Sequence, residues 1–224
     1  SLTDLEKIFK LCVSELALLG LSIQANKSAL ICLGRARKYR TLSVRISING
    51  VLLDSTRELR CLGVHFTAGQ ILKFNFDHCK SKLNAILAHV GNRADLVLPL
   101  CNAQCVPMLL YDAESMSLTN TEKIRLAHPY FRIFTKLFNT FDISIIKQCQ
   151  WYMGCMPLEY VIDLRTIKFC EKLVNSRNHV LKTIFMLNSY DEMLKLKSKY
   201  GIDKNPRISW RTMLWSHFQL SIDL

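Results

Sequence analysis

The spacing of the hydrophobic residues changes near Thr67 from the period of strands to the period of helices. In the segment before that point apolar and polar side chains alternate, as at Leu42, Val44 and Ile46, which is the pattern of a half-buried strand. After it, apolar residues recur every three or four positions, which is the pattern of amphipathic helices. The sequence therefore predicts an α+β protein, with a small antiparallel sheet followed by an all-helical region.

One helix is expected ahead of the sheet and packed on it. An apolar stripe runs from Leu2 to Leu19, Thr3 and Glu6 have the spacing of a capping box, and Gly20 suits a helix end. The expected strands cover 21–24, 29–33, 42–48, 51–53 and 59–66. Asn49-Gly50 predicts a hairpin, and the change of apolar parity beside Gly63 predicts a bulge or a close backbone approach.

The sequence predicts eight helices in the helical region, because capping signals and prolines divide its apolar stripe into segments. They cover 76–90, 96–111, 119–138, 143–152, 158–174, 179–187, 191–199 and 210–220. Pro107 is expected to kink the second. Capping boxes are expected at Thr119 with Glu122 and at Ser189 with Glu192. We expect domains at 1–70, 71–140 and 141–224.

The charge of the chain favours a polyanionic partner. Thirty Lys and Arg residues against 18 Asp and Glu give a net charge of +12, spread along the sequence. Nucleic acid is the first expectation, with membrane surfaces and acidic proteins as alternatives. No apolar run approaches the roughly 18 residues that span a bilayer, and no signal peptide is visible. We therefore expect an intracellular protein, nuclear or cytoplasmic, that is not secreted and has no membrane partner.

The residues show no catalytic or metal-binding constellation. The nine cysteines are irregularly spaced without a C-x-x-C pair, which predicts buried free thiols and no zinc site. The adjacent carboxylates Asp191 and Glu192 fit a helix start better than a metal site. No metal site or cofactor is expected in this chain.

Several segments, in their order along the chain, resemble the reverse transcriptase of non-LTR (LINE-like) retrotransposons. They are LLGLSI at 18–23, NKS at 26–28, CLGVHF at 61–66, MLLYDAE at 108–114, the helix at 119–138 and MPLEY at 156–160. The resemblance covers about residues 1–175. It implies the end of a polymerase palm, with motifs D and E, followed by a helical thumb and a helical C-terminal extension.

The resemblance also implies roles for two sites in the first seventy residues. Lys27 matches the motif D lysine, a general acid for the pyrophosphate leaving group in the intact enzyme. Leu62, Gly63, Val64 and His65 match the primer grip, where a glycine permits close approach to the primer phosphate. The alternatives are an ordinary exposed lysine in a turn and a sheet edge with a glycine bulge.

The metal-binding aspartates of motif A and of the Ala-Asp-Asp turn do not occur in this sequence. The family places them before the first helix, together with the fingers and the front of the palm. We therefore expect a fragment of an RNA-directed DNA polymerase that retains template–primer binding and is inactive alone. Mg²⁺ is expected only in the intact parent enzyme. The expected partners are an RNA template and a DNA primer, or an RNA–DNA hybrid.

Two groups of cations are candidates for nucleic-acid contact. One is a basic loop around Tyr39, which consists of Arg35, Arg37, Lys38 and Arg40. The other is a row on the helix at 119–138, which consists of Arg125, Arg132 and Lys136. It lies opposite an expected core face that carries Ile124, Ala127, Phe131, Phe134 and Phe138. A solvated loop, a nuclear-import signal and an ordinary surface helix are the alternatives. The alternative function is a non-enzymatic basic helical protein that binds acidic partners.

Overall fold

The computed structural model describes residues 2–34, 45–48, 51–70, 73–90, 94–116, 118–202 and 208–222. The chain forms two compact units, Ser1–Asn75 and Phe76–Leu224. The change of hydrophobic period near Thr67 thus lies close to the end of the first unit. Each unit is described by itself.

The first unit opens with α1 (Leu2–Leu18), which ends as the sequence predicts. Gly20 has a φ of +69°, and the Leu21 and Gly20 amides donate to the carbonyls of Leu16 and Ala17 at 2.9 and 3.0 Å. This is the Schellman arrangement that closes a helix on a glycine. The capping box predicted at Thr3 is wrong, because Thr3 lies inside the helix.

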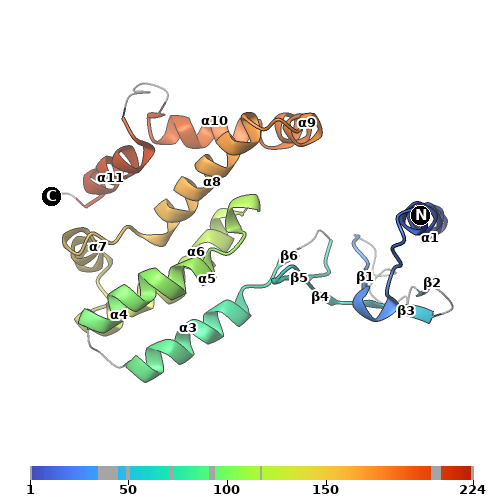
Figure 1. Ribbon diagram of the computed structural model, residues 1–224. Coiled ribbons are helices and arrows are strands. Elements are labelled where there is room, and N and C mark those ends of the chain that lie inside the picture. Colours follow the sequence, from blue (N-terminus) through green and yellow to red (C-terminus); the bar gives the residue numbers. More distant parts are fainter. Residues whose placement is uncertain are drawn as a thin grey trace. The chain divides into compact units, whose positions relative to one another are not determined.

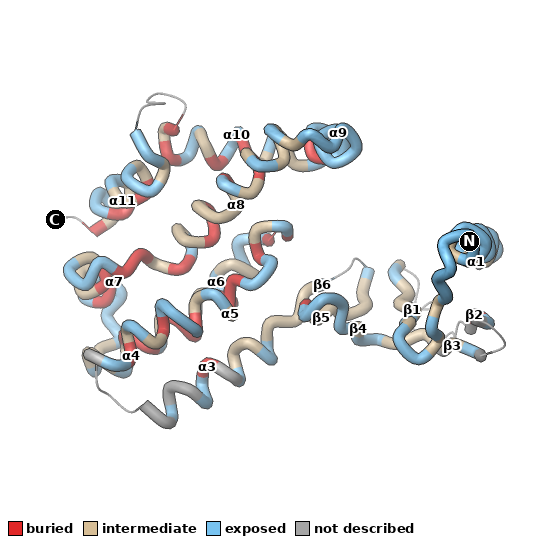
Figure 2. Tube along the Cα trace, in the orientation of Figure 1, coloured by how far each residue is buried: buried red, intermediate tan, exposed pale blue. Residues whose placement is uncertain are grey.

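The expected packing of α1 on a sheet is not seen in the part of the unit that the structure describes. Leu11 is 62% exposed and Leu18 is 81% exposed. Figure 2 shows exposed residues along nearly the whole helix. No described strand packs extensively against α1. Its amphipathic pattern therefore predicted the helix and not its partner.

Three strands form the first sheet, in the order β1-β3-β2. They are β1 (Leu30–Ile31), β2 (Arg45–Ile48) and β3 (Val51–Thr56). Ile48 lies opposite Val51 in an antiparallel pair, which confirms the predicted hairpin. The expectation of a purely antiparallel sheet is wrong, because β1 pairs with β3 in parallel. The connection between these parallel strands runs from Ile31 to Val51 and contains β2, so it has the length that a parallel pair needs.

No strand forms at the predicted position 21–24, where an extended segment leads into a short 3₁₀ helix, η1 (Ala25–Lys27). The second sheet has the order β4-β5-β6 and is antiparallel throughout. Its strands are β4 (Glu58–Cys61), β5 (Val64–Thr67) and β6 (Lys73–Phe74).

The predicted single strand 59–66 with a bulge is wrong, because the chain reverses at Leu62 and Gly63. Cys61 pairs with Val64, so these two residues form the whole turn, with φ values of +49° and +89°. Positive φ at both positions is the requirement of the tight turn whose twist matches a hairpin. The change of apolar parity marks that turn.

The second unit is helical, and its helices match most of the predicted ranges. They are α3 (Asp77–Val90), α4 (Ala94–Leu100), α5 (Val106–Leu109), α6 (Asn120–Phe138), α7 (Ile143–Tyr152), α8 (Leu158–Val174), α9 (His179–Asn188), α10 (Tyr190–Lys199) and α11 (Trp210–Leu220). The capping box at Thr119 and Glu122 is confirmed, whereas the Ser189 side chain makes no capping bond at the start of α10.

The predicted helix 96–111 is divided by a π-helical turn, η2 (Cys101–Cys105). The Val106 amide donates to the Cys101 carbonyl, five residues back. Pro107 follows at the start of α5 and has no amide hydrogen to continue the ladder. The proline therefore acts by widening the preceding turn.

Helix α8 is the centre of this unit (Figure 1), since it contacts α6, α9, α10, α11 and the short helix η3 (Ala113–Ser115). Helix α6 also packs on α3 and α7, so contacts cross the boundary expected at residue 140. Among the helices of the described residues, none has both the length and the hydropathy of a membrane crossing.

The core face of α6 differs in part from the predicted one. Phe134 is buried as expected, together with Leu126, Tyr130 and Ile133, whereas Ile124 is 60% exposed and Phe131 is half-buried. The helix is therefore rotated relative to the expectation, because α3 and α8 both pack on it. Ile124 and Phe131 line a pocket instead of the core.

Leu62 is an unfavourable residue for the β4–β5 turn. A left-handed φ costs a residue with a Cβ roughly 1–2 kcal/mol, and asparagine tolerates it better. The Leu62 side chain is 88% exposed, so a replacement loses little packing. We expect Leu62→Asn to stabilise the hairpin by about 0.5–1 kcal/mol. Slower hydrogen exchange of the Cys61 and Val64 amides measures this.

Leu62→Val is the matched control, because a β-branched side chain is the least tolerant of positive φ. It should accelerate exchange at the same amides. Slower exchange in both variants would contradict the turn geometry.

Candidate nucleic-acid interface

The predicted row of cations lies on one exposed face of α6. Arg125, Arg132 and Lys136 are spaced by seven and four residues, and all three are exposed. None of them forms a salt bridge with another residue that the structure describes. The row therefore presents uncompensated positive charge.

The only carboxylate of α6 is engaged at the start of the helix. Glu122 Oε2 accepts bonds from the Thr119 amide at 2.9 Å and from Thr119 Oγ1 at 2.7 Å. The Glu122 amide donates to Thr119 Oγ1 at 3.3 Å. This reciprocal cap keeps the carboxylate away from the outer face, so it does not neutralise the row.

An open groove of about 580 Å³ lies beside the row, between α3 and α6. Its lining consists of Asn84, Ala88, Arg132, Thr135, Lys136, Asn139 and Phe141. Two cations, two amides and a hydroxyl can bind phosphate oxygens, and none of the lining residues that the structure describes is a carboxylate.

Phe141 adds an aromatic surface to this groove. Its side chain is 88% exposed, in the segment between α6 and α7. Many proteins that bind single strands place an exposed ring next to cations: the ring stacks on a base, and the cations bind the phosphate backbone. The arrangement suits a single strand or a strand end as well as a duplex.

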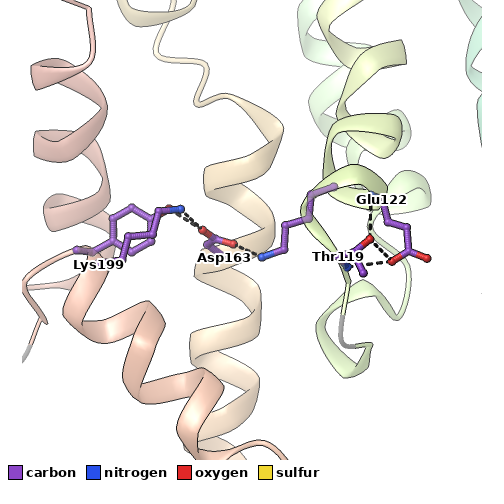
Figure 3. Close-up of polar contacts among 6 residues, drawn as sticks. Thr119, Glu122, Asp163 and Lys199 are labelled. Carbon is purple, nitrogen blue, oxygen red and sulfur yellow. Dashed lines mark hydrogen bonds and ion pairs between the residues drawn. The ribbon is translucent and has the colours of Figure 1, made fainter.

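A buried ion cluster holds α6 in place. Asp163, on α8, accepts hydrogen bonds from Lys123 Nζ at 2.8 Å, Lys199 Nζ at 2.9 Å and Tyr200 Oη at 2.6 Å. Figure 3 shows the Asp163 carboxylate between the lysine of α6 and that of α10. The cluster thus joins three helices.

The cluster keeps Asp163 ionised. Burial raises the pKa of Asp163, but hydrogen bonds from Lys123, Tyr200 and Lys199 outweigh it, so the pKa lies below its ordinary value. Burial, and then the Asp163 charge, raise the pKa of Tyr200, so its phenol stays protonated and donates.

Sequence reasoning missed Asp163 and Lys123. The available signal was a lone aspartate within the apolar stripe of 158–174, since a buried carboxylate needs cationic partners. From the sequence, Lys195, Lys197 and Lys199 are expected to complement the helix dipole of α10. Lys199 instead pairs with Asp163, and Lys197 pairs with Glu171 at 3.6 Å.

The other predicted site residues do not lie on α6. Lys27 is exposed at the end of η1, Leu62 and Gly63 form the β4–β5 turn, and Val64 and His65 begin β5. All of these belong to the unit Ser1–Asn75. The basic loop of Arg35, Arg37, Lys38 and Arg40 lies outside the described residues.

The nine cysteines are free thiols, as predicted, although Cys12 and Cys61 are exposed. Burial raises the pKa of Cys101 to about 12, and Cys105 beside it adds to this, so that thiol is neutral. In the described segments no group of three His, Cys, Asp or Glu side chains is arranged to hold a metal ion.

Comparison with known proteins identifies no relative of this chain. No protein-family model, no curated protein and no solved structure matches it.

Removal of the Asp163 charge should destabilise the helical unit. Asp163→Asn leaves Lys123 largely buried without an anion, so we expect a loss of about 3 kcal/mol. Trp151, Trp210 and Trp215 all lie in this unit, so urea unfolding followed by tryptophan fluorescence measures it. Asp191→Asn, at an exposed position, is the control and should cost less than about 1 kcal/mol.

The same cluster should make the unit sensitive to acid. Because the folded-state pKa of Asp163 is lowered, its stabilisation is complete above about pH 4 and is lost as the pH falls through the folded-state value. The difference in unfolding free energy between wild type and Asp163→Asn should therefore shrink below about pH 4. A difference that stays constant would contradict the ion cluster.

Proposed function

We propose that this chain binds the sugar–phosphate backbone of nucleic acid along α6, without reading the base sequence. One observation carries the proposal: the described residues that line the groove of Arg132 and Lys136 include phosphate-binding groups and no carboxylate. Arg125 extends the charged face toward the start of the helix.

The length of the row fits a stretch of backbone. Arg125 and Lys136 are eleven residues apart, which is about 16 Å along a helix that rises ~1.5 Å per residue. One strand of a duplex places a phosphate every ~3.4 Å of axis, so the row spans about five phosphates. Each phosphate neutralised releases counterions, so the affinity should fall steeply with salt.

Within this proposal, the resemblance to non-LTR retrotransposon reverse transcriptases indicates which kind of nucleic acid is bound. On that basis α6 acts as a thumb helix that holds an RNA template and its DNA primer, or their hybrid. The β4–β5 turn, with Gly63 exposed at its tip, then acts as the primer grip, and Lys27 as the motif D lysine. Bond formation, with its Mg²⁺ ions, belongs to the metal-binding aspartates that the family places upstream.

A second candidate is a helical protein that binds acidic protein partners. The observation in its favour is an exposed apolar patch on α9, which consists of Val180, Leu181, Ile184 and Leu187. Such a partner would not require the row on α6. Dependence of binding on that row therefore separates the two candidates.

Reversal of the row should weaken nucleic-acid binding. We expect the triple variant Arg125→Glu, Arg132→Glu, Lys136→Glu to lose at least about tenfold in affinity for a primed RNA–DNA hybrid. The slope of log affinity against log salt should decrease by about 0.9 for each phosphate that the variant no longer neutralises. Fluorescence anisotropy across a salt titration measures both.

The matched control reverses three exposed lysines elsewhere in the helical unit. Lys168→Glu, Lys182→Glu, Lys195→Glu changes the net charge equally on α8, α9 and α10. It should bind far better than the α6 variant. Equal losses in both variants, or equal binding of heparin and hybrid by each, would contradict an interface on α6.

A further inference from the structure

A second, smaller pocket lies on the other side of α6, against α7 and the start of α8. It measures about 260 Å³. Its walls are Ile124, Ala127, Tyr130, Phe131, Ile143, Pro157 and Leu158. The volume is below the ~300–1,000 Å³ of sites for drug-sized ligands, so the pocket suits one compact ring system.

The pocket contains a buried amide. Gln150 lines it and is only 3% exposed. The Gln150 carbonyl of the main chain accepts a bond from the Cys155 amide at 2.8 Å, but its side-chain amide bonds to no other described residue. Asp163, the other buried polar side chain among the described residues, has three partners.

The Gln150 side-chain amide lines the pocket and makes no hydrogen bond with another described residue, so a ligand there can bond it without breaking an existing protein contact. A ligand that offers one donor and one acceptor side by side would satisfy both ends of Gln150. The ligand must also be apolar on its faces, since most of the other lining side chains are aliphatic or aromatic.

The cation row borders this pocket. Arg125 follows Ile124 and Arg132 follows Phe131, so each cation lies about 100° around the helix from a pocket wall. Lys147 and His128 stand in the lining itself. Among the described lining residues Glu159 is the single carboxylate, and it is exposed in the first turn of α8, where the helix dipole stabilises it.

We propose that this pocket receives one unpaired nucleobase of a strand held by the α6 cations, with the Gln150 amide bonding the edge of the base. Glutamine matches the adjacent acceptor and donor of adenine. Phe131 and Pro157 contact the faces of the ring, and Lys147 lies toward the attached phosphate. This site rests on the proposed function, because the backbone on α6 delivers the base.

A nucleobase fits these observations better than an apolar peptide side chain does. A leucine or phenylalanine side chain fills the walls and leaves the Gln150 amide unpaired. A planar base fills the walls and bonds the amide, and it comes attached to the negative charge that the neighbouring cations attract.

The first test compares two strands of equal charge. A short oligodeoxyadenylate should bind about tenfold more tightly than an abasic strand with the same number of phosphates, a gain in the range for one stacked base. Gln150→Leu keeps the volume and removes the amide, so it should reduce that preference severalfold with an unchanged salt slope. Reversal of Arg125, Arg132 and Lys136 should instead weaken both strands equally.

The second test needs no variant and no phosphate. Adenosine added to the ¹⁵N-labelled protein should shift the Gln150 side-chain amide resonances. Equal affinity for the two strands together with unshifted resonances would overturn the base site. Shifts caused by N-acetyl-leucinamide and not by adenosine would assign the pocket to a peptide and overturn it as well. If the backbone proposal is wrong, reversal of Arg125, Arg132 and Lys136 leaves the affinity for both strands unchanged. That result is distinct from failure of the base site.

Discussion

The carboxylate of Asp163 decides how the helical unit is assembled. Its bonds to Lys123, Lys199 and Tyr200 join α6, α8 and α10, which are far apart in sequence (Figure 3). A buried charge is tolerated only where its partners replace the lost hydration, so three donors converge on it. The position of the Lys123 side chain has a second consequence, besides stability. Because this side chain points inward to Asp163, the three cations Arg125, Arg132 and Lys136 lie on the opposite, outer side of the helix.

Three faces of helix α6 have three different surroundings. The face with Leu126, Tyr130 and Ile133 is buried in the unit. The face with Arg132 and Lys136 lines the groove toward α3, and the face with Ile124 and Phe131 lines the pocket toward α7. A charged strip with a polar groove on one side and an apolar pocket on the other can hold a backbone and a base together. This arrangement connects the two proposals.

The two units differ in how completely their elements bury apolar surface. In the helical unit, α8 is surrounded by four other helices, and Trp151, Trp215 and Phe218 pack ring against ring. In the first unit, α1 keeps most of its apolar side chains exposed, and its described strands are two to six residues long. Short strands and an uncovered helix leave apolar surface for a further partner, whereas the helical unit buries its apolar surface between its own helices.

The sequence by itself determined the helices of 76–224, because their period, caps and prolines are local signals that reappear as α3 to α11. It also determined the β2–β3 hairpin and the line of cations on α6. Only the tertiary structure decided the parallel pairing of β1, the true core face of α6, and the grouping of Asn84 and Phe141 with Arg132. Local periodicity cannot specify these features, because each depends on which distant segment packs against a given face. A pattern of side chains shows that a face exists, and only its neighbours decide whether it becomes core, groove or pocket.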